Sequence, residues 1–279
     1  MSYKSIVVHL DASERAAYRL DVALLLATHF KAHLVAVYAT FAPEPRAFGI
    51  MAASAGWYEQ VQAACQERCE LLGGLFHAGM ARTGASGDWI EARIDARKAL
   101  ARHGRCADLI IAGQSDPNDP QTYVADHVAE TLVMTAGRPL LLIPYLGAFP
   151  EGGANILVGW DGSREATRAV HDALPFLKDA GQVTLLTIGA GKGELPGSRI
   201  PCADIATTLA RHDVRVSVRE TVDAADARVG DALLSEGRSI GADLIVMGGY
   251  GHSRWQEMVL GKCTWTVLRA ITIPVLMSH

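Results

Sequence analysis

Short apolar runs alternate along this chain with longer amphipathic stretches. In the second half, the pattern predicts strands near residues 155–160, 182–188, 214–221, 243–247 and 274–277, and helices near residues 164–179, 201–212, 226–240 and 261–270. Runs that are apolar throughout, such as Leu244-Ile-Val-Met247, are typical of strands buried on both faces of a parallel sheet. Their alternation with helices predicts a doubly wound α/β sheet, and the first half follows the same plan.

The order of the elements restarts near Asn155, which indicates two similar halves. Asp11 and Ser13 follow the first apolar run, and Asp161 and Ser163 follow the corresponding run 150 residues later. Aspartate and serine are common helix N-caps, so all four side chains have a structural interpretation. For Asp11 we prefer this interpretation, whereas for Asp161 capping and contact with a ligand both stay open.

A second matching pair, Ala107-Asp-Leu-Ile110 and Ala242-Asp-Leu-Ile245, is separated by only 135 residues. The first half therefore contains 15 extra residues. We place part of them in residues 41–56, whose Pro, Ala and Gly content predicts a long loop or lid. The turn-forming residues of segment 144–153 predict a linker, so we expect one domain at residues 1–148 and a second at residues 149–279.

Composition narrows the functional classes. Of the 279 residues, 49% are apolar and 20% are charged, as in soluble globular proteins. The formal charge of -4, with 26 Lys and Arg against 30 Asp and Glu, argues against nucleic acid and anionic membranes as partners. Apolar stretches stay below the ~18 residues that span a bilayer, and the chain opens on a strand-like run instead of a signal peptide. We therefore expect a cytoplasmic protein that is not embedded in a membrane.

The five cysteines lack C-x-x-C spacing, which favours reduced, buried thiols over a disulfide framework or a zinc site. Cys65 and Cys69 would share one helix face, and His77, two turns further on, could join them as a metal ligand. Core packing is the alternative for these side chains, and we prefer it.

A glycine-rich segment follows the predicted strand that ends at Met247. Gly248, Gly251 and Gly261 form the pattern G-x2-G-x9-G directly before the last predicted helix. Glycine permits positive φ and a close approach of the main chain to phosphate, and the N–H groups of a helix start attract anions. The segment therefore predicts an anion site, although it lacks the spacing of a Walker loop.

Together, Asp161-Gly-Ser163, the pattern Met247-Gly-x2-Gly-x9-Gly and the closing Pro274-Val-Leu276 resemble the universal stress protein family. The resemblance covers essentially the whole chain as a tandem pair. It implies that each domain is a Rossmann-like sheet of the adenine nucleotide alpha hydrolase-like type. It also implies an adenine nucleotide as the ligand of the second domain, with ATP, alone or together with Mg²⁺, as the first candidate.

In nucleotide-binding members of that family, the Asp after the first strand lies by the adenosine. The end of the second strand contacts the base, and the glycine loop holds ribose and phosphates. Transferred by position, the resemblance implies a site formed by Asp161, Ile188, Met247, Gly248, Gly251, His252, Gly261, Lys262, Cys263 and Thr264. His252 lies inside the glycine loop, where it could touch a phosphate or a partner.

One position departs from the family's ATP-binding pattern, which has Ser or Thr directly after the third glycine. Here that position is Lys262, which could give a charge-assisted hydrogen bond to phosphate or extend into solvent. Thr264 matches the family's second hydroxyl, and it could contact phosphate or cap the start of the last helix.

The first half departs further, because Gly113 is kept but Asp116 and Asp126 replace the other two loop glycines. Phosphate would meet negative charge there, which predicts a structural or regulatory role for the first domain. Alternatively, Asp116, Asp119 and Asp126 could bind a cation, although a solvated acidic loop is the simpler interpretation.

The sequence contains neither G-x-S-x-G nor H-E-x-x-H, so we expect at most weak ATP hydrolysis. One function is a stress-response module in which a nucleotide in the second domain controls conformation or partner binding. The alternative is a nucleotide-independent interaction or scaffold protein. The resemblance also implies that the last strands of the two domains pair, here residues 139–143 with residues 274–277. A homodimer or another protein partner fits either function.

Overall fold

The described part of the chain forms two compact units. A computed structural model describes residues 2–39, 55–92, 94–116, 118, 128–147, 149, 153–188, 201–221, 229–250 and 262–279. We call residues 3–132 the N-terminal unit and residues 133–279 the C-terminal unit. No helix within the described ranges is both long and apolar enough to cross a membrane.

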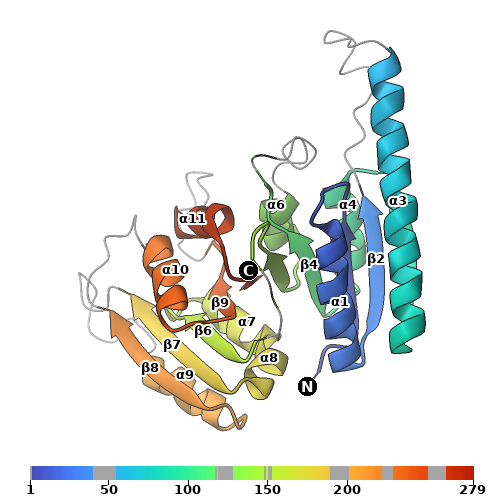
Figure 1. The fold of residues 1–279 in the computed structure, drawn as a ribbon. Helices are drawn as coiled ribbons and strands as arrows, with labels where there is room; N and C mark the ends of the chain where they lie inside the picture. The colour runs from blue at the N-terminus through green and yellow to red at the C-terminus, as the bar shows by residue number, and fades with distance from the viewer. Residues whose placement is uncertain are drawn as a thin grey trace. The chain divides into compact units, whose positions relative to one another are not determined.

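The N-terminal unit is a parallel sheet with helices between its strands (Figure 1). Its elements are β1 (Ser5–Leu10), α1 (Ala16–Phe30), β2 (His33–Ala39), α3 (Ala55–Thr83), β3 (Gly87–Ala92), α4 (Ala96–Gly104) and β4 (Leu109–Gly113). The strands lie in the order β3-β2-β1-β4. α6 (Val128–Thr135) spans the residue at which the two units divide.

The C-terminal unit repeats this plan and adds two strands. Its elements are β5 (Leu140–Ile143), β6 (Asn155–Gly159), α7 (Arg164–Asp172), α8 (Leu174–Asp179), β7 (Gln182–Ile188), α9 (Cys202–Ala210), β8 (Val216–Thr221), α10 (Val229–Ser239), β9 (Leu244–Gly248), α11 (Lys262–Ala270) and β10 (Val275–Ser278). The strands lie in the order β5-β10-β9-β6-β7-β8, and β6 is parallel to both neighbours. The predicted fold, two tandem doubly wound α/β sheets, is confirmed.

β5 and β10 form the antiparallel pair of the C-terminal unit. Val275 lies opposite Leu142, and Met277 lies opposite Leu140. All these side chains are buried, so the pairing covers two strand edges that would otherwise be exposed. The predicted pairing of the last strands is therefore confirmed. The domain boundary near residue 148, which we inferred from the turn-forming residues of segment 144–153, stays a prediction.

The repeated Ala-Asp-Leu-Ile motif fastens the start of the first strand in each unit. The Oδ2 atom of Asp108 accepts the backbone N–H groups of Lys4 and Ser5, at 2.7 and 3.0 Å. In the C-terminal unit, the carboxylate of Asp243 accepts the two corresponding N–H groups, at 2.8 and 3.0 Å. Each aspartate thus joins the strand that follows it to the first strand of the same sheet.

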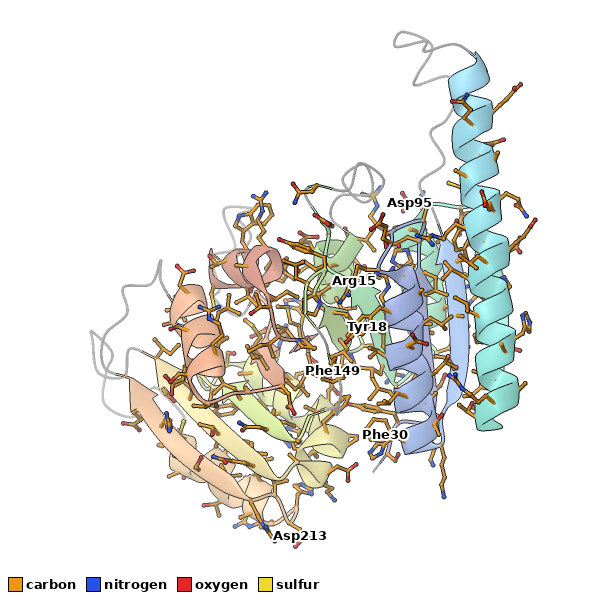
Figure 2. All side chains as sticks on the ribbon, viewed as in Figure 1. Arg15, Tyr18, Phe30, Asp95, Phe149 and Asp213 are labelled. Carbon is orange, nitrogen blue, oxygen red and sulfur yellow. The ribbon has the colours of Figure 1, made fainter. Side chains whose placement is uncertain are left out.

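The apolar strand runs form the core of each unit. Ile6 and Ile110 of the N-terminal sheet and Ile156 and Ile245 of the C-terminal sheet are fully buried, as expected for strands covered on both faces. At the start of α4, the side chain of Asp95 accepts the backbone N–H groups of Arg97 and Lys98 (Figure 2).

The predicted helix over residues 164–179 is two helices, so our prediction of one continuous helix was wrong. α7 ends at Asp172 and α8 begins at Leu174. Pro175 lies in the first turn of α8, where a backbone N–H would have no partner within the helix, so its absence costs no hydrogen bond. It could not continue α7, because a proline ring inside a helix clashes with the carbonyl group four residues before it.

The extra residues of the first half lie partly in a helix. α3 contains 29 residues, whereas α9, at the corresponding place of the C-terminal unit, contains 9. Residues 55–56, which we predicted as the end of a loop, belong to α3, and the rest of segment 41–56 lies outside the described residues. Figure 1 shows the first turns of α3 extending past the end of β2.

Of the side chains considered as metal ligands, one is buried and another is hydrogen-bonded within α3. Cys69 is buried, and Nδ1 of His77 lies 2.7 Å from the carbonyl oxygen of Gly73 in the same helix. Burial raises the pKa of the Cys69 thiol, as does a hydrogen bond with Glu91, to about 12. Among the described residues, no group of three or more His, Cys, Asp and Glu side chains could hold a metal ion.

Candidate functional site

The carboxyl ends of β6, β7 and β9 form the edge at which we predicted a ligand. β6 lies between β9 and β7, and the three strands are parallel. Asp161 follows β6, Ile188 ends β7, and Met247 and Gly248 end β9. Open parallel sheets bind ligands at such an edge. The structure therefore brings these four predicted residues to one edge of the C-terminal sheet.

Asp161 lies exposed in the turn between β6 and α7. Its Oδ1 atom accepts the backbone N–H of Ser163 at 2.9 Å. Ser163 is the N-cap of α7, because its Oγ accepts the N–H of Ala166 at 3.1 Å. Gly162 between them has a φ of 77°, a conformation that favours glycine. Capping is thus the role of Ser163, and the carboxylate of Asp161 remains exposed at the strand end.

Gly248 is packed against the start of α7. A Cβ atom at this position would lie 2.6 Å from the backbone nitrogen of Ala166 and 2.7 Å from the carbonyl carbon of Glu165. These are backbone atoms, which cannot turn aside as the end of a flexible side chain can. Only glycine therefore lets α7 approach β9 this closely, whether or not Gly248 also contacts a ligand.

The structure gives Thr264 a contact that we did not predict, and its contact with phosphate stays a prediction. It is buried in α11, and its Oγ1 accepts the backbone N–H of Tyr250 at 3.1 Å. Tyr250 follows β9 and has a φ of 60°, in the left-handed region. The hydroxyl of Thr264 therefore ties the start of α11 to the chain that leaves β9.

Cys263 lies in the first turn of α11, next to two carboxylates. Burial raises the pKa of its thiol, and Asp161 and Asp231 raise it further, to about 11. The thiol is therefore neutral at pH 7. Asp231 comes from the first turn of α10. Sequence reasoning missed this residue, because one aspartate near a helix start is indistinguishable from an ordinary favourable charge there.

Part of the predicted site lies outside the described residues. This applies to Gly251, His252 and Gly261, and to the side chain of Lys262. The backbone of Lys262 begins α11, which places this residue in the first turn of that helix. The contacts predicted for these four residues stay predictions.

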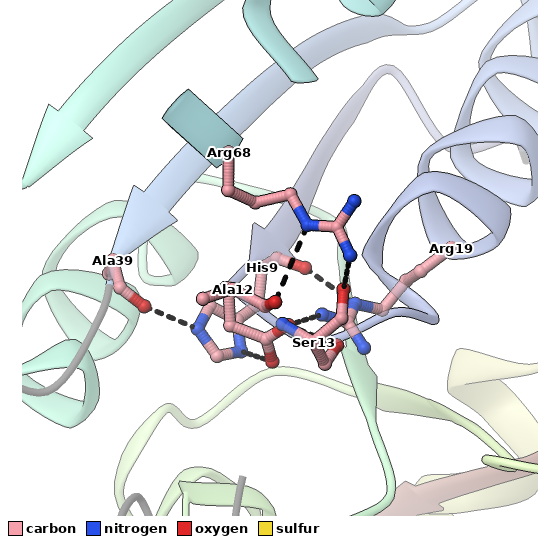
Figure 3. A network of polar contacts seen from close by, with 7 residues as sticks. His9, Ala12, Ser13, Arg19, Ala39 and Arg68 are labelled. Atoms are coloured by element: carbon pink, nitrogen blue, oxygen red, sulfur yellow. Dashed lines mark hydrogen bonds and ion pairs between the residues drawn. The ribbon is translucent and has the colours of Figure 1, made fainter. Parts of the chain in front are cut away.

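The matching edge of the N-terminal unit is filled by its own polar side chains (Figure 3). The buried Arg19 places Nη2 2.8 Å from Oδ1 of Asp11, and its Nε donates to the carbonyl oxygen of His9 at 2.6 Å. From α3, Arg68 donates to the carbonyl oxygen of Ser13 at 3.2 Å. The carboxylate that corresponds to Asp161 is thus already bound by a cation of the same unit.

Asp11 does not cap α1, and the prediction that it does was wrong. The N-cap residue of α1 is Arg15, and no side chain caps this helix. Burial alone would raise the pKa of Asp11, but Arg19, His9 and the hydroxyl of Ser13 outweigh it and hold the pKa at about 2. The carboxylate of Asp11 pairs with the buried Arg19, eight residues further along the chain, instead of capping α1.

Arg19 also occupies the space beside the end of β4. A Cβ atom on Gly113 would lie 1.9 Å from Nη1 of Arg19. Sequence reasoning missed Arg19, although a signal was present. At the repeat spacing of 150 residues, Arg19 corresponds to Ala169, so the two halves differ here between a long cation and a methyl group.

Of the three aspartates in the acidic loop of the first half, Asp116 is the one that the structure describes. Its Oδ1 accepts the backbone N–H of Asn118 at 2.8 Å. Asp119 and Asp126 lie outside the described residues, so cation binding by this loop stays a prediction.

Comparison with known proteins adds the family context. Residues 154–279 match the model of the universal stress protein family. The chain is similar in fold to a universal stress protein from Archaeoglobus fulgidus DSM 4304, with a TM-score of 0.70, 15% identity, and 98% of this chain and 95% of that chain covered. A search of the curated proteins found no match.

Two further solved structures match about half of the chain. A protein of the universal stress protein family from Burkholderia pseudomallei is 32% identical, with 51% of this chain and 96% of that chain covered and a TM-score of 0.35. A universal stress protein in complex with cAMP is 16% identical, with 52% of this chain and 98% of that chain covered and a TM-score of 0.36.

Proposed function

Because the chain belongs to the universal stress protein family, we propose that its C-terminal unit binds an adenine nucleotide, in the first place ATP, alone or with Mg²⁺. The nucleotide lies at the carboxyl ends of β6, β7 and β9. Its binding favours one conformation of this unit and so changes the association with a protein partner. The N-terminal unit serves as a structural or regulatory companion.

The contrast between Asp161 and Asp11 carries this proposal. Both residues follow the first strand of their unit, but Asp11 is bound to the buried Arg19, whereas Asp161 is exposed. Ala169 stands at the position of Arg19 and cannot form an ion pair. The exposed carboxylate of Asp161 is therefore accessible to a hydroxyl or amino group of a nucleoside, whereas the carboxylate of Asp11 is bound within its own unit.

The start of α11 supports binding of the phosphates. The N–H groups of the first helical turn lack partners within the helix and carry partial positive charge. Lys262 adds a cation to this turn, and the neutral thiol of Cys263 adds no negative charge. Asp161 and Asp231 lie nearby and oppose a polyphosphate, an opposition that Mg²⁺ on the phosphates would reduce.

The test is to denature the purified protein, identify any nucleotide released, and titrate the nucleotide-free protein calorimetrically with ATP, ADP, AMP and cAMP. Gly261→Glu places a carboxylate in the predicted phosphate loop and should abolish binding. The matched control is Asn118→Glu, which adds the same charge to an exposed position in the corresponding loop of the N-terminal unit and should leave binding unchanged. Absence of binding for all four nucleotides at millimolar concentration would refute the proposal.

A second candidate is a nucleotide-independent interaction protein. It is favoured by the hydroxyl of Thr264, which accepts the N–H of Tyr250, and by the carboxylates of Asp161 and Asp231 beside the thiol of Cys263. If the protein acts in this way, Gly261→Glu leaves partner recovery in pulldowns unchanged.

If ATP binds, weak hydrolysis is tested by comparing phosphate release by the unchanged protein with phosphate release by Gly261→Glu.

A further inference from the structure

α10 and α11 approach each other closely at a glycine of α10. A Cβ atom on Gly230 would lie 2.9 Å from the carbonyl oxygen of Cys263 and 2.9 Å from Cβ of Thr266. Neither atom belongs to the flexible end of a side chain, so an added methyl group can be accommodated only if one helix shifts. The carbonyl group belongs to the first turn of α11, which is the turn that we propose as the phosphate-binding end.

The same turn is also fixed to the chain after β9 and lies near two carboxylates. The N–H of Tyr250 donates to Oγ1 of Thr264, which fixes α11 to the chain after β9. The thiol of Cys263 lies near Asp161 and Asp231, which come from the end of β6 and the start of α10. A displacement at Gly230 therefore changes the position of α11 relative to the strand end that carries Asp161.

We infer that Gly230 is a positioning residue for the nucleotide site, an inference that rests on the proposed function. It sets the distance between the first turns of α10 and α11, and so places the N–H groups of α11 where phosphate is bound. Glycine is an unfavourable residue inside a helix, and Ala is the most favourable one. Helix stability alone would therefore favour Ala at position 230. The close contact with Cys263 and Thr266 explains why glycine stands there instead.

The experiment compares Gly230→Ala with Gly237→Ala, a buried glycine of the same helix. A Cβ atom on Gly237 would meet only side-chain atoms of Ile245 and Ile273, the nearest at 3.1 Å, and these can adjust. Gly230→Ala should weaken ATP binding about tenfold, as expected for loss of one charge-assisted hydrogen bond. Gly237→Ala should bind ATP as the unchanged protein does.

A second measurement does not depend on nucleotide. Alkylation of Cys263, followed by mass spectrometry over a range of pH, reports its pKa, which lies at about 11 in the unchanged protein. A displaced α11 exposes the thiol and moves it relative to Asp161 and Asp231, so Gly230→Ala should lower this pKa, and Gly237→Ala should not. A role of Gly230 in stability alone would leave the pKa of the folded variant unchanged.

The two measurements separate failure of the inference from failure of the proposed function. If the unchanged protein binds no nucleotide, the proposed function fails, and with it the role of Gly230 in binding. If it binds ATP, and folded Gly230→Ala binds equally well with an unchanged Cys263 pKa, the inference alone is overturned. Should Gly230→Ala not fold, Thr266→Leu enlarges the side chain that faces Gly230 from α11. Unchanged ATP affinity in that variant overturns the inference as well.

Discussion

The aspartate that follows the first strand of the N-terminal unit is part of a polar network. In the N-terminal unit, Asp11 is ionised and bound to Arg19, and burial lowers the pKa of the neighbouring His9 even though Asp11 acts in the other direction. Nε2 of His9 lies 3.0 Å from the carbonyl oxygen of Ala39, so the neutral ring carries its proton there. The network therefore binds the carboxylate of Asp11 within the N-terminal unit.

The first prediction concerns the acid stability that Asp11 provides. Its pKa in the folded protein is about 2, against ~3.9 for an unfolded aspartate. The ionised form is favoured by folding, so the contribution is complete above about pH 4 and disappears as the pH falls towards 2. This difference corresponds to roughly 2 kcal/mol.

Chemical unfolding of the unchanged protein and of Asp11→Asn, measured between pH 2 and pH 7, checks this prediction. The free-energy difference between the two should shrink by roughly 2 kcal/mol from pH 5 to pH 2. A difference that stays constant over this range would show that Arg19 does not stabilise the ionised carboxylate.

The second prediction concerns Asp243, which accepts two backbone N–H groups at the start of β6. Asp243→Ala should lower the free energy of unfolding by about 2 kcal/mol, because charge-assisted hydrogen bonds to the main chain are lost. The control is Asp88→Ala, whose carboxylate is 70% exposed and pairs with His33 at the surface. That substitution should change stability by less than ~1 kcal/mol. Equal effects of both substitutions would contradict the assigned role of Asp243.

At the scale of elements, the edge of the C-terminal sheet is shaped by glycines that hold helices close. Gly248 brings the start of α7 against β9, and Gly230 brings α10 against α11. α7 begins just after the strand end that carries Asp161, and the start of α11 is hydrogen-bonded to Tyr250, which follows β9. The positions of the helix starts, and with them the shape of the candidate site, therefore depend on glycines, which have no Cβ atom to keep the helices apart.

The third prediction tests this packing. Gly248→Ala should destabilise the protein by about 2 kcal/mol, because its Cβ would lie 2.6 Å from a backbone nitrogen of α7. The matched control is Gly159→Ala at the end of the neighbouring strand β6, where the nearest atom is Cδ1 of Leu233 at 3.3 Å. This control should change stability by less than ~1 kcal/mol, as measured by chemical unfolding. Similar losses in both variants would indicate that the contact with α7 is not limiting.

At the scale of the whole molecule, two units with separate cores share one chain but differ at corresponding edges. In the N-terminal unit, Arg19 fills the space beside Gly113, whereas in the C-terminal unit the backbone of α7 lies beside Gly248. A ligand that binds only at the edge of the C-terminal sheet contacts the C-terminal unit alone. Binding to the folded form stabilises that unit by mass action.

The fourth prediction is that ATP at about 100 times its Kd stabilises the C-terminal unit by about 2.7 kcal/mol. Hydrogen exchange measured by mass spectrometry should show slower exchange in β6, β7 and β9 and little change in β1, β2 and β4. Gly261→Glu serves as the control that removes the effect. Equal protection of both units would point to a second site in the N-terminal unit, against the proposed assignment.

Much of the fold could be predicted from the sequence, because it depends on local periodicity. The strands 155–159, 182–188 and 244–248 lie within two residues of their predicted ranges. The break between α7 and α8 was missed although Pro175 marks it, and α3 begins within residues predicted as a loop. The position of Asp161 at the strand end was also predictable, since the motif after β6 fixes it.

The sequence by itself determined the repeat and the α/β order, because these follow from hydrophobic periodicity and from matching motifs, whereas the pairing of the last strands was implied by the family resemblance. It could not determine that Asp11 is occupied while Asp161 is exposed, because both belong to the same Asp-x-Ser motif. Tertiary structure decided this difference through Arg19, which reaches back from α1 to the carboxylate of Asp11. Burial and charge depend on what packs against a side chain in space, and this is set by elements that local sequence does not bring together.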